Sequence, residues 1–249
     1  MSVSMKEDGL VLVSEDDGSL PIGTASPLGL YYHDTQFLSG FALRINGQAP
    51  ALLSANTEQN YVGAFQLANR PATLDDGSIL PSQSLSVRRT RFLADGLRER
   101  VGILNCNPAK VRLRLEIEFD ASFRDMFVVR GYRGVPAVVA PSPVEVIPNG
   151  IRFQRLGRDG VRRTTDVTMR PAPDRIEGNT FVLERELAPQ EIVTYELAIV
   201  PREDGAGEAP APRDFDEALD ALNAKYRRFL RTCADYSTSS ESLDEELVL

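Results

Sequence analysis

The segment from Val111 to Phe119 alternates apolar and charged side chains without a break, and it constrains the fold more than any other stretch. Its apolar members are Val111, Leu113, Leu115, Ile117 and Phe119, and its charged members are Arg112, Arg114, Glu116 and Glu118. A period of two predicts a β-strand with one buried face and one face that is solvated or paired across strands. Burying the five apolar side chains would contribute on the order of 10 kcal/mol before chain entropy is subtracted.

Other segments with strand character follow one another at short spacing. We predict strands at residues 9–13, 37–45, 51–53, 61–67, 85–93, 97–104, 144–147, 151–155, 164–169, 181–187 and 192–200. Asn46-Gly47 predicts a tight hairpin turn because both residues tolerate positive φ, with 51–53 as the returning strand. Residues 94–96 predict a second hairpin. The pattern indicates a mainly β fold, a large antiparallel β-sandwich, rather than βαβ units.

The composition changes after Val200, where Pro, Ala, Gly and Glu predominate. We expect a β-sandwich domain at 1–201, a linker at 202–213, a linker helix at 214–235 and a tail at 236–249. Asp214 and Glu217 have the spacing of a capping box at the start of this helix. Apolar residues then recur at helical spacing, at Phe215, Leu219, Leu222, Tyr226, Phe229 and Cys233.

Charge and cysteine content exclude several classes of function. The 249-residue chain has a net charge of −8, which argues against nucleic acid as the main partner. The polar N-terminus lacks the apolar core of a signal peptide, and no apolar run is long enough to span a membrane. Cys106 and Cys233 lie far apart, and a single histidine cannot build a common zinc site. We therefore expect a cytoplasmic protein with free thiols and no metal or nucleotide cofactor.

The stretch from Gly29 to Gly40 is richer in aromatic and polar groups than a turn between strands requires. It contains His33, the only histidine of the chain, directly before Asp34. In one interpretation, His33 and Asp34 face a sugar or a partner domain. In the other, Asp34 and Thr35 hydrogen-bond the local backbone while the neighbouring aromatic side chains pack. The residues alone leave both interpretations open.

A second polar group follows the alternating strand, between Phe119 and Gly131. There the two-residue alternation gives way to spaced Phe, Asp and Arg residues, and Asp125 and Arg130 have the chemistry to pair at a domain surface. The alternative is a strand edge with solvated charges. The candidate binding or interface residues are Tyr32, His33, Asp34, Asp125 and Arg130. We assign no catalytic residue, because no nucleophile motif occurs and the carboxylates fall mostly on solvent faces or in turns.

Three ordered blocks of sequence carry a resemblance to a known family. They are residues 32–40 (Tyr-His-Asp-Thr-Gln-Phe-Leu-Ser-Gly), residues 45–47 with 52–54, and residues 123–131 (Phe-Arg-Asp-Met-Phe-Val-Val-Arg-Gly). Over roughly residues 8 to 201 the chain resembles the N-terminal domain of bacterial glycogen debranching enzymes of the amylo-α-1,6-glucosidase type. One departure is Gln36, where the family pattern usually has an arginine.

The resemblance implies a large β-sandwich joined by a linker helix to an (α/α)6 toroid, which carries the two acidic residues for inverting hydrolysis. Residues 242–249 then correspond to the first helix of that toroid, so no catalytic residue carries over to this chain. The implied partners are the downstream catalytic domain and, as a candidate ligand, glycogen or α-glucan.

A free-standing carbohydrate-binding or scaffold sandwich is the alternative. It is weakened by the absence of tryptophan, the best side chain for stacking on sugar rings.

Overall fold

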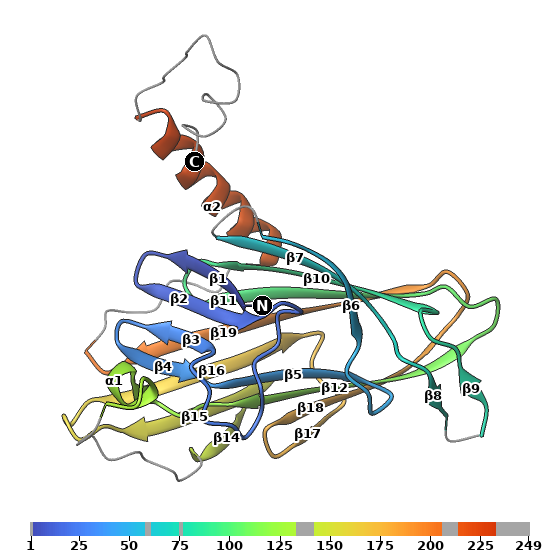
Figure 1. Ribbon diagram of the computed structural model, residues 1–249, viewed down its shortest axis with the longest axis horizontal. Helices are drawn as coiled ribbons and strands as arrows, with labels where there is room; N and C mark the ends of the chain where they lie inside the picture. Colours follow the sequence, from blue (N-terminus) through green and yellow to red (C-terminus); the bar gives the residue numbers. More distant parts are fainter. Residues whose placement is uncertain (1, 58–60, 75–76, 133–141, 206–213, 233–249) are drawn as a thin grey trace. The chain divides into compact units, whose positions relative to one another are not determined.

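Antiparallel strands build most of the described chain in the computed structural model (Figure 1). The structure describes residues 2–57, 61–74, 77–132, 142–205 and 214–232. The chain divides into two compact units, residues 1–210 and 211–249. The first unit contains all the described strands, which form sheets of eight, five, four and two strands. A mainly β architecture with a C-terminal helix was predicted, and the structure confirms it.

The largest sheet has eight strands in the order β14-β15-β16-β19-β11-β10-β7-β6. Their bounds are β6 Ala51–Asn56, β7 Val62–Ala68, β10 Leu85–Leu93, β11 Leu97–Asn105, β14 Val144–Ile147, β15 Gly150–Leu156, β16 Arg162–Arg170 and β19 Ile192–Glu203. The predicted hairpin around 94–96 joins β10 to β11, with Leu93 opposite Leu97.

Three smaller sheets and two helices complete the described elements. The four-stranded sheet contains β5 Gly40–Ile45, β12 Val111–Asp120, β17 Arg175–Glu177 and β18 Thr180–Leu187. The five-stranded sheet contains β1 Ser2–Glu7, β2 Leu10–Glu15, β3 Gly29–Tyr32, β4 Thr35–Leu38 and β13 Arg124–Asp125. The two-stranded sheet pairs β8 Ala72–Thr73 with β9 Ile79–Leu80, and the helices are α1 Met126–Val129 and α2 Phe215–Leu230.

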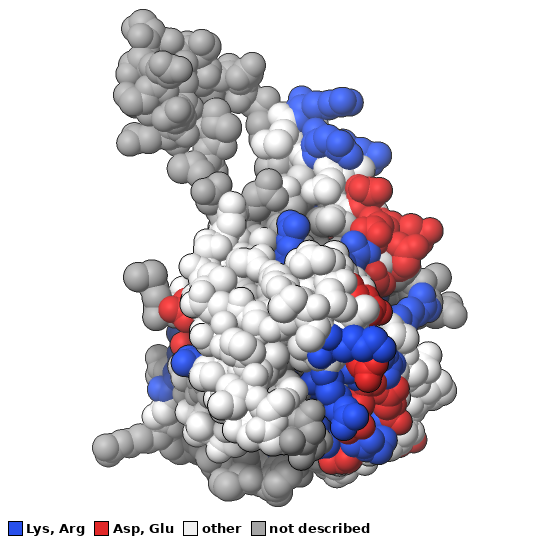
Figure 2. All heavy atoms as spheres, turned by 90° about the vertical axis from the view of Figure 1, so that its right-hand side faces the viewer, with Lys and Arg blue, Asp and Glu red and all other residues white. Residues whose placement is uncertain are grey.

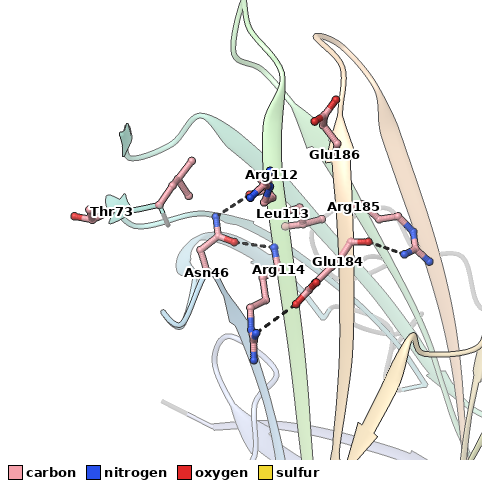
Figure 3. A pocket seen from close by; sticks show the side chains of 9 residues that line it. Asn46, Thr73, Arg112, Leu113, Arg114, Glu184, Arg185 and Glu186 are labelled. Carbon is pink, nitrogen blue, oxygen red and sulfur yellow. Dashed lines mark hydrogen bonds and ion pairs between the residues drawn. The ribbon is translucent and has the colours of Figure 1, made fainter. Parts of the chain in front are cut away.

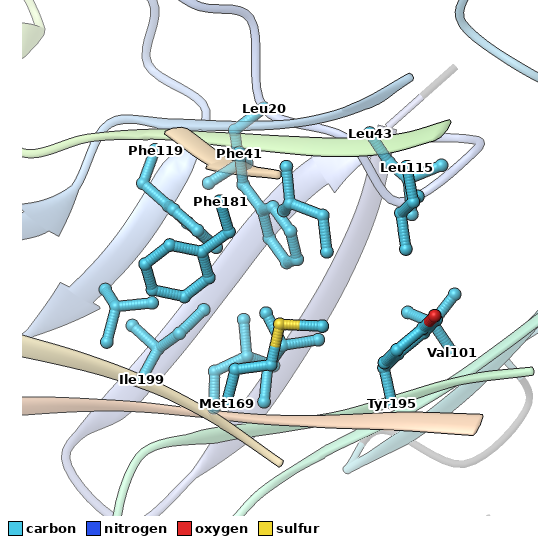
Figure 4. Close-up of a cluster of buried hydrophobic side chains, with 14 of the residues drawn as sticks. Leu20, Phe41, Leu43, Val101, Leu115, Phe119, Met169, Phe181, Tyr195 and Ile199 are labelled. Atoms are coloured by element: carbon cyan, nitrogen blue, oxygen red, sulfur yellow. The ribbon is translucent and has the colours of Figure 1, made fainter. Parts of the chain in front are cut away.

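The alternating segment is β12, and its faces are as predicted. Its five apolar side chains are buried, whereas Arg112 is exposed and the other three charged side chains are partly exposed. β12 lies between β5 and β18, with Leu115 opposite both Ile45 and Leu183. Figure 4 shows the resulting core, in which side chains of this sheet such as Phe119 face side chains of the eight-stranded sheet such as Ile199. The two facing layers form the expected sandwich.

The Asn46-Gly47 turn forms as predicted, but its returning strand does not pair where expected. Asn46 and Gly47 have φ values of 48° and 78°, and Ile45 and Gln48 exchange two backbone hydrogen bonds across the turn. β6 then pairs with β7 in the eight-stranded sheet, while β5 pairs with β12. The chain therefore crosses from the four-stranded to the eight-stranded sheet after the turn, and β5 stays at the edge of its own sheet.

Several short elements were not predicted. They are β1, β3, β8, β9, β13, β17 and the single-turn helix α1. β1 is a polar strand that pairs with β2, and only Met5 and Glu7 of its six residues are buried. Such short or polar strands carry too few alternating apolar positions to give a periodic signal; their pairing depends on neighbours distant in sequence.

Helix α2 begins where the capping pattern predicts. Asp214 is its N-cap, and its carboxylate Oδ1 accepts a 2.8 Å hydrogen bond from the backbone N of Glu217. Most of the predicted linker (residues 206–213), the last residues of the predicted helix including Cys233, and the predicted tail 236–249 lie outside the described residues.

Three charged side chains lie inside the sandwich. Arg89 and Arg91 of β10 and Glu99 of β11 are at most 1% exposed. The Glu99 carboxylate contacts Arg89 Nε at 2.6 Å and Arg91 Nη2 at 2.5 Å. Burial lowers the pKa of Arg91 to about 10, so this guanidinium remains charged at neutral pH. One carboxylate thus serves two cations, and the buried group carries a net positive charge.

Aromatic rings and a backbone turn complete the surroundings of the buried group. The Arg91 guanidinium lies 5.5 Å from the centre of the Phe41 ring and 5.2 Å from that of Phe65, which are distances for cation–π attraction. Arg89 Nη1 donates to the backbone O of Asp17 at 3.1 Å. At Gly18 (φ 80°) an added Cβ would lie 3.1 Å from both the Arg91 guanidinium and the Phe65 ring. The turn before Leu20 therefore needs glycine to cover the buried charges.

Replacing Glu99 tests the buried group. Glu99→Gln should destabilise the protein by about 3–5 kcal/mol, because it leaves two buried guanidinium groups without a counter-charge. Urea unfolding followed by circular dichroism measures this loss. Glu186→Gln is the matched control, because Glu186 pairs with Lys110 at an exposed site and should cost under about 1 kcal/mol. Equal midpoints for the two variants would contradict the buried ion pairs.

The two faces of β12 give a second test. Leu115→Asp should unfold the domain, because an unpaired buried carboxylate costs several kcal/mol, comparable to the stability of a whole domain. Arg112→Ala should change stability by less than about 0.5 kcal/mol, because its side chain is exposed. Thermal unfolding measures both, and a cooperative transition at the wild-type temperature for Leu115→Asp would show that the face assignment is wrong.

Candidate functional site

The turn between β3 and β4 presents the only histidine at one end of the sandwich. His33 has a φ of 51°, and its backbone N donates to the O of Gly9 at 3.1 Å. Its ring stacks on the ring of Tyr32, with 4.1 Å between centroids. Gly9 makes room for both rings, because an added Cβ would lie 3.3 Å from the Tyr32 ring and 3.4 Å from the His33 ring. The turn is thus held by backbone bonding, and both rings remain partly or largely exposed.

His33 also faces the end of the last strand of the β unit. Its Nδ1 lies 3.7 Å from Glu203 Oε2 at the end of β19. Glu203 also accepts a 2.9 Å hydrogen bond from Arg163 Nε. The His33 side chain is 60% exposed, so any ion pair formed on its protonation is well screened by solvent. Sequence reasoning missed Glu203, because nothing near it in sequence signals a partner 170 residues away.

Asp34 is exposed, and its carboxylate makes no hydrogen bond within the described residues. Its backbone O accepts a 2.7 Å hydrogen bond from the N of Met126, the first residue of α1. The turn and α1 are therefore neighbours, although more than 90 residues separate them in sequence. The Asp34 side chain does not perform the local capping that one interpretation assigned to it.

Asp125 performs a capping role instead, at the start of α1. Its Oδ1 accepts a 2.7 Å hydrogen bond from the N of Phe127, and its backbone pairs with Thr35 of β4. Arg130 follows the helix, and its backbone N donates to the O of Met126 at 2.9 Å. Asp125 and Arg130 form no ion pair with each other in the described part of the chain. The capping carboxylate is thus engaged locally, while the guanidinium of Arg130 is left without a carboxylate partner there.

The five predicted residues come from two segments that the fold brings together. We call Tyr32, His33, Asp34, Asp125 and Arg130 the turn surface. β4 pairs with β3 on one side and with β13 on the other, which places the turn beside α1. In Figure 1 α1 lies close to the ends of β3 and β4. Next to this surface, the exposed rings of Phe127 and Tyr132 meet edge to face, with 5.3 Å between centroids.

Gln36 lies buried beneath the turn surface and joins its two segments. Its Nε2 donates to the backbone O of Leu28 at 2.8 Å and to that of Ser26 at 3.2 Å. Its Oε1 accepts from Ser122 Oγ at 2.7 Å and from Arg124 Nη2 at 3.1 Å. Both ends of the amide are therefore used in the interior. The sequence singled out Gln36 as a departure from a family pattern but gave no sign of this bonding role.

Tyr31 adds a second buried polar contact at the same place. Its hydroxyl donates to the backbone O of Pro27 at 2.7 Å. Burial raises the pKa of the Tyr31 hydroxyl, and the positive charges of Arg124 and Arg130 oppose that rise. The hydroxyl therefore stays neutral at physiological pH and serves as a hydrogen-bond donor. Arg124 is a further residue that sequence reasoning did not single out, although it lies within the second polar block.

On one face of the molecule the surface charges are mixed in sign. Figure 2 shows basic and acidic side chains interleaved in one band on the face in view. Among the described residues, no three His, Cys, Asp or Glu side chains gather as metal ligands would. Neither helix in the described part has the length and apolarity needed to cross a bilayer.

The relation to known proteins rests on a family model. Residues 5–198 match the model of the N-terminal domain of some glycogen debranching enzymes. The chain belongs to this family. Both segments of the turn surface lie within the matched residues. A comparison with curated protein sequences gave no match.

One solved structure shares the fold of this chain. A protein described as a kojibiose phosphorylase from the human microbiome is similar at a TM-score of 0.52 and 9% identity, over 92% of this chain. This chain spans 33% of that protein. Two others have lower TM-scores. A protein described as an aldose 1-epimerase from Escherichia coli K12 gives 0.43 at 12% identity, over 81% of this chain and 99% of that one. The 4-α-glucanotransferase from Thermococcus litoralis gives 0.38 at 9% identity, over 80% of this chain and 37% of that one. At such identities the first likeness shows a shared fold alone.

Substitution of Gln36 should lower the stability of the chain, whereas substitution of Asp34 should not. Gln36→Leu should destabilise the 249-residue chain by about 2–4 kcal/mol, because it leaves buried donors and acceptors without partners. Asp34→Ala should change the stability by less than about 0.5 kcal/mol, because its carboxylate is exposed and unbonded in the described structure. Chemical denaturation of the two variants measures the difference. A loss of 1 kcal/mol or more for Asp34→Ala would instead indicate a local structural role.

Proposed function

We propose that this chain is the non-catalytic N-terminal domain of a glycogen or α-glucan debranching glycoside hydrolase. It supports a downstream catalytic domain, and its turn surface faces that domain near the sugar site. The proposal rests on family membership together with one observation about the surface. Two segments distant in sequence, held together by Gln36, bring polar and aromatic side chains to one place.

The chemistry of the turn surface supports contact with a polar partner. The Asp34 carboxylate and the Arg130 guanidinium make no ion pair within the described residues, so both charges are available. A carboxylate binds sugar hydroxyls or a partner arginine, and a guanidinium binds a partner carboxylate at two points. The exposed rings of Phe127 and Tyr132 add the aromatic area that is enriched at interfaces. Within one sandwich domain these groups have no evident task.

The proposal assigns no bond cleavage to this chain. Inverting hydrolysis requires an acid and a base about 6.5–9.5 Å apart across a bound sugar. The two carboxylates of the turn surface do not suit these roles, because Asp125 is engaged in capping α1 and Asp34 is then left without a second carboxylate to complete the pair. The chain therefore acts by positioning, and hydrolysis belongs to the domain that follows.

The test uses the longer enzyme that contains the catalytic domain. Asp34→Ala and Arg130→Ala should each lower glucose release from glycogen limit dextrin by about tenfold, equivalent to about 1.4 kcal/mol of lost interaction. The melting temperature of the 249-residue chain should not change with either variant. The 249-residue chain alone should release no glucose.

Asp16→Ala is the matched control for this test. Asp16 is another exposed aspartate without a hydrogen bond in the described structure, and it adjoins the end of β2 opposite to the end that pairs with Tyr32. Its replacement should leave activity unchanged. Full activity of the Asp34 and Arg130 variants would refute the positioning role. Glucose release by the isolated chain, abolished by one internal Asp or Glu substitution, would refute the non-catalytic assignment.

A further inference from the structure

A second surface feature lies on the four-stranded sheet. A pocket of about 380 Å³ opens at β12 and β18, beside the Asn46 turn and the segment that follows β8. Its lining consists of Asn46, Thr73, Leu74, Arg112, Leu113, Arg114, Glu184, Arg185 and Glu186. The volume falls within the range of small-ligand sites. Figure 3 shows the charged side chains of the two strands around it.

The Asn46 side chain fixes one wall of the pocket to β12. Its Oδ1 accepts a 2.7 Å hydrogen bond from the N of Arg114, and its Nδ2 donates to the O of Arg112 at 3.3 Å. Both ends of this amide are used by the backbone. Contacts to a ligand would therefore come from the charged side chains rather than from Asn46.

Ion pairs hold most of these charged side chains in place. Arg114 donates to Glu116 at 2.9 Å and to Glu184 at 3.3 Å, and Arg175 donates to Glu184 at 2.9 Å. On the other side of the pocket, Lys110 donates to Glu186 at 2.8 Å. Side chains that already hold one another lose less conformational freedom when a ligand binds. The pocket thus presents donors and acceptors at defined positions.

Arg112 differs from its neighbours, because its exposed guanidinium has no hydrogen bond or ion pair within the described residues. Its donors are free for a ligand. The carboxylates remain acceptors: hydrogen bonds from Arg175 lower the pKa of Glu184, and a hydrogen bond from Lys110 lowers the pKa of Glu186. Both groups are ionised at neutral pH.

The side chains around the pocket carry equal numbers of positive and negative charges, and this balance favours a neutral ligand. Three arginines and two glutamates line the pocket. Their ion pairs attach Lys110, Arg175, Glu116, Asp174 and Glu177, so the whole network holds five positive and five negative side chains. An anion would meet Glu184 and Glu186, and a cation would meet the guanidinium groups. A hydroxyl group, in contrast, both donates and accepts a hydrogen bond, so it can bridge a carboxylate and a guanidinium.

We propose that this pocket binds a short stretch of a neutral, polyhydroxylated ligand, an α-glucan chain. This deepens the proposed function, on which it rests, by giving the non-catalytic domain a glucan contact apart from the turn surface. No aromatic ring is among the lining residues, so stacking does not contribute and binding is weak, with a Kd on the order of 1 mM. Branched glycogen offers many chain ends, which raises the effective affinity of such a site.

The test uses the 249-residue chain with two probes, glycogen in affinity gel electrophoresis and maltoheptaose in calorimetric titration. The wild-type chain should be retarded by glycogen. Arg112→Ala should weaken maltoheptaose binding about fivefold or more without a change in melting temperature. Arg88→Ala is the matched control, because Arg88 is also an exposed arginine without a partner in the described part of the chain, but lies on β10 of the other sheet. Its binding should equal that of the wild type.

Three results would overturn the assignment: no retardation of the wild-type chain, equal binding by Arg112→Ala and wild type, or tighter binding of inorganic phosphate than of maltoheptaose. Phosphate binding would identify the pocket as an anion site. These outcomes leave the proposed function intact if Asp34→Ala still lowers the activity of the longer enzyme. Glucan binding that depends on Arg112, with full activity of the Asp34 variant, would refute the turn-surface role alone.

Discussion

Two arginines share one glutamate inside the sandwich, and the rest of the β unit must keep these buried charges paired and covered. Ions leave water at high cost, and losing one member of a buried group is far more damaging than replacing all of them. The group is complete only when β10 and β11 are in register, Phe41 faces it from the opposite sheet, and the Asp17-Gly18 turn covers it. It thus joins the two layers to the N-terminal segment, whose strand β2 pairs with β3 at the turn surface.

Buried polar groups in this domain hold its structure together, whereas several exposed ones are available for binding. Gln36 and Tyr31 are hydrogen-bonded to partners of the same chain. Arg89 and Arg91 are ion-paired with Glu99, and all these groups define shape. Asp34, Arg130 and Arg112 are exposed and unpaired in the described structure, and they are available to other molecules. The second group depends on the first. A one-residue slip of β12 would turn Arg112 into the core and Leu113 out of it, and loss of Gln36 would remove the side-chain hydrogen bond from β4 to Ser122.

The regular part of the fold could be predicted from the sequence, because its signals lie within single short segments. Nine alternating residues of β12 predict which face is buried and which is exposed. The Asn46-Gly47 turn is predicted because both residues tolerate positive φ. The pairing of β6 with β7 could not be predicted in this way, because a strand after the turn could pair with the edge strand β5 as well as with β7. For the candidate site, the polar blocks around His33 and Asp125 were visible. Their adjacency, the burial of Gln36 and the contact with Glu203 were not, because each is made between segments far apart in the chain.

The contact between His33 and Glu203 shows where the chain leaves the sheet. Glu203 is the last residue of β19, so the backbone leaves the sheet within a side chain's length of the turn surface. Whatever the polypeptide carries onward from that point starts its path beside Tyr32 and His33. Under the proposed function, a module carried on the same chain meets the turn surface at a higher local concentration than a separate molecule would. A weak contact with that surface would then be occupied more often than the same contact between free molecules.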